Sequence, residues 1–216
     1  MRRHAHDDGD DRRAGRRDAF DDATDRSGIA QVAAQLIVEH GIGDWSLAKR
    51  KAARQLGLPD RAALPRDDEI EAALVDYHAI FGGDEHIAML RDKREAALDW
   101  MQRLAEFRPL LVGGVAGGWA SEHSDVRLDL VADDSKSVEI ALLNAGCEYR
   151  HAPTRRADDP VDLLIDTPRT GVRLRVRTPQ EARQVPRRDR RGQPEPRLDA
   201  AAVRALLATA PAGAGR

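Results

Sequence analysis

The chain has 216 residues, of which 41% are hydrophobic and 33% charged, and its formal net charge is −2. This near balance argues against a uniformly basic nucleic-acid-binding protein. No run of about 18 apolar residues occurs, so we expect no membrane-spanning segment. The single cysteine, Cys147, excludes a disulfide within the chain. No apolar core follows the N-terminal arginines, as a secretory signal would require, so we expect a cytoplasmic protein.

The N-terminal segment mixes Arg and Asp with almost no apolar side chains. Such a segment buries too little surface to offset its ordering entropy, so we predict a disordered charged tail over residues 1–27. Apolar residues at helical spacing then predict a helical region over residues 28–107. Its expected helices cover residues 29–41, 44–56, 65–81 and 84–107.

At Pro109 the apolar pattern changes from helical spacing to that of strands. A buried strand is expected to run into a glycine turn, and a second strand of alternating character follows. An amphipathic helix, a short strand and a hairpin around a TPRTG turn come next. These elements are expected in residues 109–115, 124–133, 135–146, 147–152 and 161–179.

Helices that precede a strand-rich segment are typical of an α+β fold. We therefore predict an N-terminal helical bundle followed by a mixed β-sheet domain over residues 108–179. Residues 180–216 are basic and proline-rich at first and then return to an apolar helical pattern. This last part predicts a linker and a short C-terminal helix.

Two glycines and one aspartate mark the start of the strand-rich segment. Gly113 and Gly114 follow the first strand, and Asp125 begins the second. This pattern resembles the start of the catalytic core in nucleotidyltransferases of the polymerase-beta type. In that family a glycine turn ends the first strand, and the second strand carries an Asp-x-Asp or Asp-x-Glu pair. The resemblance is closest to small bacterial members with N-terminal helices, and it covers residues 29–178.

The resemblance implies transfer of a nucleotidyl group from a nucleoside triphosphate, with Mg²⁺ as cofactor. Two divalent cations hold the triphosphate and activate the attacking hydroxyl in such a reaction. Carboxylates two residues apart on a strand share one face and can therefore share an ion. Asp125 is accordingly implied as a catalytic and metal-binding residue. Gly113 and Gly114 are implied as phosphate-binding residues, because a turn without Cβ atoms lets backbone N–H groups approach phosphate.

The chain departs from this pattern at the second carboxylate. Arg127 stands where the family has Asp or Glu. Asp129 shares the strand face of Asp125 but lies about 13 Å from it at the usual strand rise. That distance is too long for the two carboxylates to share a magnesium ion easily.

The later hairpin strand departs from the pattern as well. It offers arginines at 173, 175 and 177 where the family supplies a third carboxylate. Asp162 and Asp166, on the first hairpin strand, are the nearest acidic replacements. Several arginines around Asp125 would repel magnesium rather than collect it.

Three hypotheses stay open from the sequence. In the first, transfer survives with Asp125 and Asp129 as catalytic residues. In the second, the site is degenerate, and Asp125 forms an ion pair with Arg127 or with a hairpin arginine. In the third, Arg127, Arg173 and Arg175 replace the metal and bind the phosphates of a nucleotide or a nucleic acid, because guanidinium matches phosphate bidentately.

Further features could contact a ligand or only solvent. Residues 173–197 carry nine arginines against one aspartate and two glutamates, a net charge of +6, and are the best candidate for contacting nucleic acid or another polyanion. A basic helical face in residues 49–54 could bind RNA or a phosphate group, or stay solvated. In the loop before Asp125, Trp119 could stack on a base or cover the loop, and His123 could touch phosphate or water.

Overall fold

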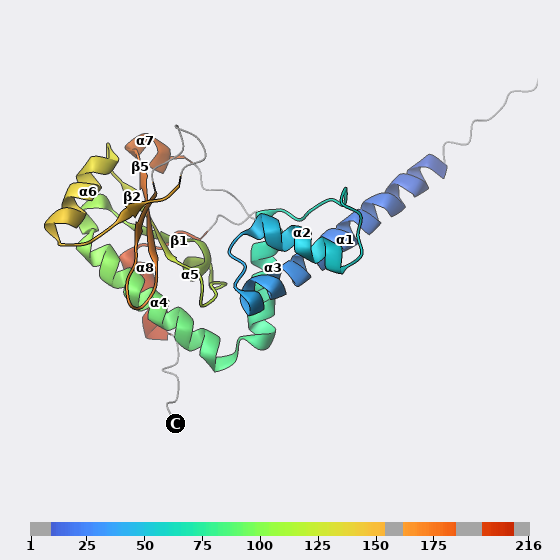
Figure 1. The fold of residues 1–216 in the computed structure, drawn as a ribbon, viewed down its shortest axis with the longest axis horizontal. Coiled ribbons are helices and arrows are strands. Elements are labelled where there is room, and N and C mark those ends of the chain that lie inside the picture. The colour runs from blue at the N-terminus through green and yellow to red at the C-terminus, as the bar shows by residue number, and fades with distance from the viewer. Residues whose placement is uncertain (1–9, 154–161, 185–195, 210–216) are drawn as a thin grey trace, which may run out of the picture. The chain divides into compact units, whose positions relative to one another are not determined.

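The computed structural model of the chain describes residues 10–153, 162–184 and 196–209 (Figure 1). Its architecture is α+β, with a helical region followed by a five-stranded mixed sheet, which confirms the predicted fold class. Two compact units make up the chain, residues 1–77 and 78–216. Within the described ranges no helix is both long and apolar enough to cross a membrane.

The first unit is helical. It contains α1 (Asp10–His40), α2 (Trp45–Gln55) and the greater part of α3 (Asp67–Phe81). The Asp44 carboxylate accepts hydrogen bonds from the first backbone N–H groups of α2, as expected of an N-terminal cap. Lys49 Nζ lies 2.6 Å from Asp67 Oδ1 and joins α2 to α3. The buried apolar residues of this unit include Ile29, Ala33, Leu36, Ala48, Ala52, Ile70 and Leu74.

Helix α1 corrects part of the predicted tail. It begins at Asp10, so residues 10–27 are helical where we expected a disordered segment, and residues 1–9 lie outside the described ranges. Composition limits how much surface a segment can bury, but it does not forbid helix. The packed turns from Ile29 onward nucleate the helix, and its extension over Asp and Arg residues then costs little.

The second unit is built on a sheet of strand order β1-β2-β5-β4-β3. β2 and β5 are parallel, and the other neighbouring pairs are antiparallel. The predicted hairpin is present, with β4 paired antiparallel to β5. The strands are β1 (Leu110–Val112), β2 (Val126–Val131), β3 (Arg150–His151), β4 (Asp162–Ile165) and β5 (Val172–Arg177).

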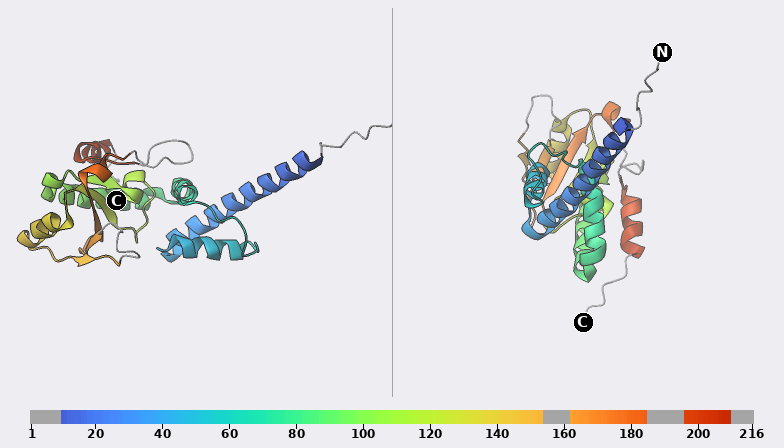
Figure 2. Two further views of the ribbon diagram at one scale, coloured as in Figure 1. Left: turned by 90° about the horizontal axis from the view of Figure 1, so that it is seen from above. Right: turned by 90° about the vertical axis from the view of Figure 1, so that its right-hand side faces the viewer.

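Helices α4, α6 and α8 contribute to the core of this unit together with one face of the sheet. Figure 2 gives two further views of these elements, and α4 and α8 contact one another. The remaining helical segments are short. The bounds are α4 (Gly83–Arg103), the 3₁₀ helix η1 (Ala105–Phe107), α5 (Gly113–Gly117), α6 (Ser135–Asn144), α7 (Pro179–Ala182) and α8 (Ala200–Thr209).

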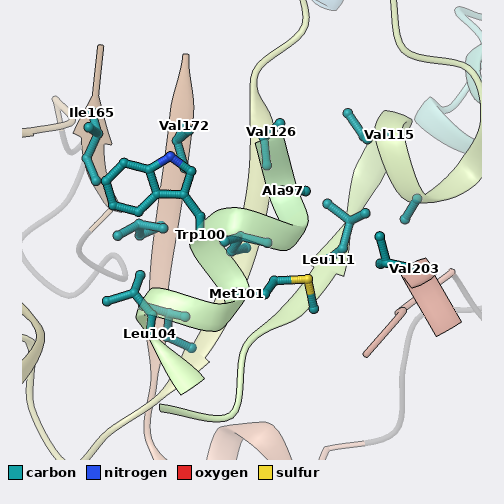
Figure 3. Packing of buried hydrophobic residues seen from close by; sticks show 14 of the residues in the cluster. Ala97, Trp100, Met101, Leu104, Leu111, Val115, Val126, Ile165, Val172 and Val203 are labelled. Carbon is teal, nitrogen blue, oxygen red and sulfur yellow. The ribbon is translucent and has the colours of Figure 1, made fainter. Parts of the chain in front are cut away.

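The core explains why α4 belongs with the sheet. Ala97, Trp100 and Met101 of α4 and its C-terminal cap residue Leu104 form a stripe that packs among apolar strand residues and Val203 of α8 (Figure 3). Full burial of one such large side chain contributes about 1.5–3 kcal/mol. The sequence pattern grouped residues 28–107 as one helical region, whereas the division between the compact units falls at residues 77 and 78. Helical spacing identifies an apolar stripe but not its partner, and the partner of this stripe is the sheet.

Candidate functional site

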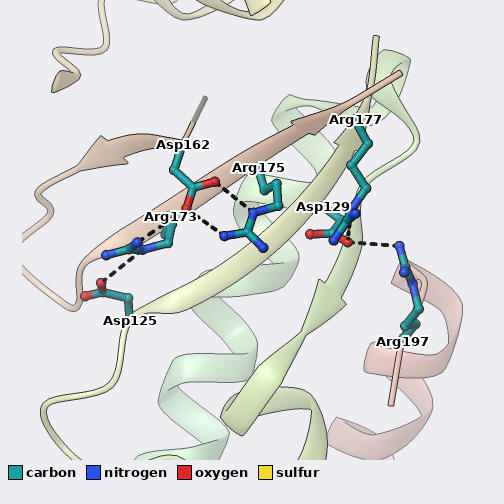
Figure 4. A network of polar contacts seen from close by, with 7 residues as sticks. All are labelled: Asp125, Asp129, Asp162, Arg173, Arg175, Arg177 and Arg197. Atoms are coloured by element: carbon teal, nitrogen blue, oxygen red, sulfur yellow. Dashed lines mark hydrogen bonds and ion pairs between the residues drawn. The ribbon is translucent and has the colours of Figure 1, made fainter. Parts of the chain in front are cut away.

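Charged side chains gather on one face of the sheet. Along β2 and β5 apolar residues that point to the core alternate with charged residues that point away from it. β2 and β5 are parallel and in register, so Arg127 lies beside Arg173, and Asp129 lies beside Arg175. We call this surface the charged face; all of its members except Arg127 appear in Figure 4. It comprises Asp125, Arg127, Asp129, Asp162, Arg173, Arg175 and Arg177.

Asp162 begins β4 and is held by two arginines of β5. Its Oδ1 accepts a hydrogen bond from Arg175 Nε at 2.8 Å. Its Oδ2 accepts from Arg175 Nη2 at 3.0 Å and from Arg173 Nη1 at 3.3 Å. Burial raises the pKa of Asp162, but the hydrogen bonds and charges of Arg175 and Arg173 outweigh it and lower the pKa. This carboxylate is therefore engaged by arginine.

Asp129 is engaged in the same way, further along β2. Its Oδ2 accepts hydrogen bonds from Arg177 Nε at 2.6 Å and from Arg197 Nη2 at 2.9 Å. Its side chain is only 5% exposed. Two guanidinium groups thus face the second carboxylate that the sequence offered for catalysis. Asp129 serves in this structure as the anchor of Arg177 and Arg197.

Asp125 is the most exposed carboxylate of the charged face, at 39% of its side chain. Its Oδ2 lies 3.9 Å from Arg173 Nε. For a degenerate site we considered Arg127 or a hairpin arginine as the partner of Asp125, and the partner is the hairpin arginine Arg173. The carboxylate lies directly against Gly171, where a Cβ atom would collide with it. Asp166, the other acidic residue considered, pairs instead with Arg150 Nε at 3.3 Å.

Arg127 differs from the other arginines of the charged face in its ion pairing. It is exposed, and no carboxylate of the described residues lies within ion-pair distance of its guanidinium. Lost solvation, together with the positive charges of Arg173 and Arg175, lowers the pKa of Arg127, and Asp125 and Asp162 offset this in part. Arginine nevertheless stays charged at neutral pH.

The glycine turn accommodates the protein's own side chains. Gly113 has a φ of 69° and begins α5, a short helix where we expected only a turn. A Cβ on Gly113 would lie 3.2 Å from Arg127 Cδ, and one on Gly114 would lie 2.9 Å from the Trp119 ring. Both glycines are buried. Arg127 and Trp119 thus occupy the side of the turn where Cβ atoms would stand, and phosphate binding by Gly113 and Gly114 stays a prediction.

The donor set does not fit a magnesium centre. Magnesium requires several oxygen ligands around one point. In the part of the chain that the structure describes, no three His, Cys, Asp or Glu side chains come together in this way. Each carboxylate of the charged face instead has an arginine beside it.

No protein-family model matches this chain, and no curated protein matches it.

The structure adds one residue to this region that the sequence did not indicate. Lys93 of α4 is only 6% exposed and donates three hydrogen bonds. Its Nζ lies 2.7 Å from the Ser124 carbonyl, 3.0 Å from Thr170 Oγ1 and 3.1 Å from the Glu122 carbonyl. Lys93 therefore joins the loop before Asp125 to the hairpin turn before Gly171. In the sequence, the available signal was a lysine within the amphipathic helix pattern; its burial is seen only in the structure.

The basic segment 173–197 is described in part, since residues 185–195 lie outside the described ranges. Four of its arginines, at 173, 175, 177 and 197, already pair with aspartates. Trp119 packs against Gly114 and Gly117, and so covers the loop. In residues 49–54, Lys49 is buried and paired, and Arg50, Lys51 and Arg54 are exposed.

Proposed function

We propose that this chain is a nucleotidyltransferase-like protein that binds a phosphate-bearing ligand, such as a nucleoside triphosphate, on its charged face and has lost efficient transfer. The observation that carries the proposal is Arg127, an exposed residue whose guanidinium has no carboxylate partner among the described residues. It lies beside Arg173, an arginine that two aspartates share. The proposal includes a cytoplasmic location, where nucleoside triphosphates are available.

The balance of charge supports phosphate as the ligand. Five arginines, the four of the charged face and Arg197, meet three aspartates, which leaves a net charge of +2. Guanidinium donates two parallel hydrogen bonds to phosphate, which gives both affinity and orientation. Arg127 is free of ion pairs with the described carboxylates, so a phosphate would not have to displace one.

The same balance argues against efficient nucleotidyl transfer. The reaction of the family uses divalent cations held by converging carboxylates. Here Asp129 and Asp162 are each held by two arginines, and Asp125 is paired with Arg173. Asp125 is thus the remaining exposed carboxylate of the family pattern on this face.

A small ligand is favoured over a nucleic acid. Single-stranded nucleic acids are commonly bound by aromatic side chains on which bases stack. The charged face as defined above contains only Asp and Arg, and Trp119 is engaged with the glycine turn. Three of its four arginines are already in ion pairs.

Two measurements test the proposal on the full chain. Isothermal titration calorimetry with ATP and GTP is expected to detect binding that weakens in the Arg127→Gln variant. Pyrophosphate release from labelled nucleoside triphosphates with magnesium is expected to stay at background at high protein concentration. Asp125→Asn is the control for any residual release. Failure to bind either nucleotide, or release that depends on Asp125, would contradict the proposal.

A further inference from the structure

The charged face combines two properties that bear on which form of a phosphate ligand it takes. A protein can bind a nucleotide either as its complex with Mg²⁺ or as the free anion. A site for the complex needs oxygen donors for the metal, and a site for the free anion needs cations of its own. The residues present distinguish these cases.

The carboxylates of the charged face are oriented toward arginines. The short contacts, 2.6 Å from Asp129 Oδ2 to Arg177 Nε and 2.8 Å from Asp162 Oδ1 to Arg175 Nε, use the oxygens that a metal would need. A divalent ion would have to displace these guanidinium groups and then remain beside them. Among the described residues Asp125 is the acidic group of this face with the weakest ion pair, and one carboxylate is a poor magnesium site.

Arg127 provides the cation that a free anion would need. It stands two residues after Asp125, where the family pattern has its second carboxylate, and it lies in register beside Arg173. Neighbouring strands are about 4.8 Å apart, so two such guanidinium groups can contact one phosphate. Gly113 leaves room for the Arg127 side chain, because a Cβ atom at this position would lie 3.2 Å from Arg127 Cδ.

The local potential agrees with this arrangement. The positive charges of Arg173 and Arg175 disfavour a further cation at Arg127, and they would disfavour a magnesium ion there more strongly because its charge is double. The same charges favour a phosphate. An anion placed between Arg127 and Arg173 would relieve their mutual repulsion.

We propose that Arg127 takes the place of the metal, and that the charged face binds its phosphate-bearing ligand as the magnesium-free anion. Binding is then strongest without Mg²⁺, and Mg²⁺ competes with the protein for the phosphates. This inference rests on the proposed function, because it specifies the form in which the ligand binds at the same site.

The test measures the affinity of the full chain for inorganic tripolyphosphate and for ATP, once with excess EDTA and once with excess MgCl₂. We expect binding in EDTA and weaker binding in MgCl₂. In EDTA, Arg127→Gln is expected to weaken binding about 10-fold or more, the loss of one charge-assisted hydrogen-bonding group. Arg204→Gln, which removes an exposed arginine of α8, is the matched control and is expected to leave affinity unchanged.

The outcomes separate this inference from the proposed function. Binding that requires MgCl₂ would overturn the inference and leave the proposed function standing. An Arg127→Gln variant with unchanged affinity in EDTA would also overturn it. Absence of binding under both conditions would remove the proposed function and the inference together. Arg127→Gln leaves no described carboxylate without its ion pair, so we expect it to fold, and circular dichroism checks this.

Discussion

Arg197 reaches across to Asp129, with Nη2 2.9 Å from Oδ2, and so joins the segment before α8 to the middle of the sheet. The contact is reinforced nearby, where Leu198 and Leu111 exchange backbone hydrogen bonds of 2.8 and 2.9 Å. Asp129 thus holds two parts of the unit together as well as neutralising Arg177. Its role can be separated from any role in ligand binding by measuring stability.

Asp129→Asn is expected to lower the free energy of unfolding by about 2–3 kcal/mol. Removing one partner of a buried pair costs roughly 3–5 kcal/mol, and the partial exposure of Arg177 and Arg197 reduces that figure. Urea denaturation followed by circular dichroism measures the change. The control is Asp125→Asn, whose 39% exposed side chain and 3.9 Å contact predict a loss below about 1 kcal/mol. Equal losses in both variants would contradict this ranking.

The sequence predicted the elements around the site well, because their signals are local. The helix expected in residues 135–146 is α6, Ser135–Asn144, and the hairpin around the TPRTG turn is β4 and β5. Period-two alternation also placed the arginines of β5 on one face. These inferences need only neighbours along the chain.

The pairing of charges could not be predicted in the same way. Asp129 meets Arg177 and Arg197 because β2 lies parallel to β5 and because Leu198 pairs with β1. Both facts are set by tertiary packing between segments far apart in sequence. The sequence identified arginines near Asp125, but only the register distinguishes Arg173, which pairs with it, from Arg127, which does not.

Lys93→Met is expected to destabilise the second unit by about 2–4 kcal/mol. The variant leaves three buried or half-buried acceptors without their charged donor, and hydrogen bonds to charged groups contribute about 1.5–3 kcal/mol each with strong non-additivity. Urea denaturation gives the value. Lys136→Met, at an exposed position of α6, is expected to change stability by less than about 0.5 kcal/mol. A Lys93 variant as stable as the Lys136 variant would contradict the bridging role.

Gly114→Ala and Gly171→Ala are expected to lower the free energy of unfolding by different amounts, although other atoms lie close to both glycines. At Gly114 the new Cβ would lie 2.9 Å from the Trp119 ring and 3.1 Å from the Ala120 backbone, so we expect a loss of about 1–3 kcal/mol. At Gly171 it would meet the Asp125 carboxylate, which can rotate away, so we expect less than about 1 kcal/mol. Thermal and urea denaturation compare the two variants, and a costlier Gly171→Ala would contradict this reasoning.

His78 and His86 of the second unit stack with their ring centroids 3.7 Å apart. We expect the stability of this unit to depend on pH through them. Burial, and then the charge of His86, lower the pKa of His78 from 6.5 to about 4. Below pH 6.5 the unfolded chain therefore binds a proton at His78 more readily than the folded chain does. The contribution of neutral His78 to stability is fully present above about pH 6.5 and is lost between about pH 6.5 and 4. Urea midpoints across pH measure this. His78→Gln should flatten the fall and exposed His123→Gln should not; identical profiles would exclude His78 as its source.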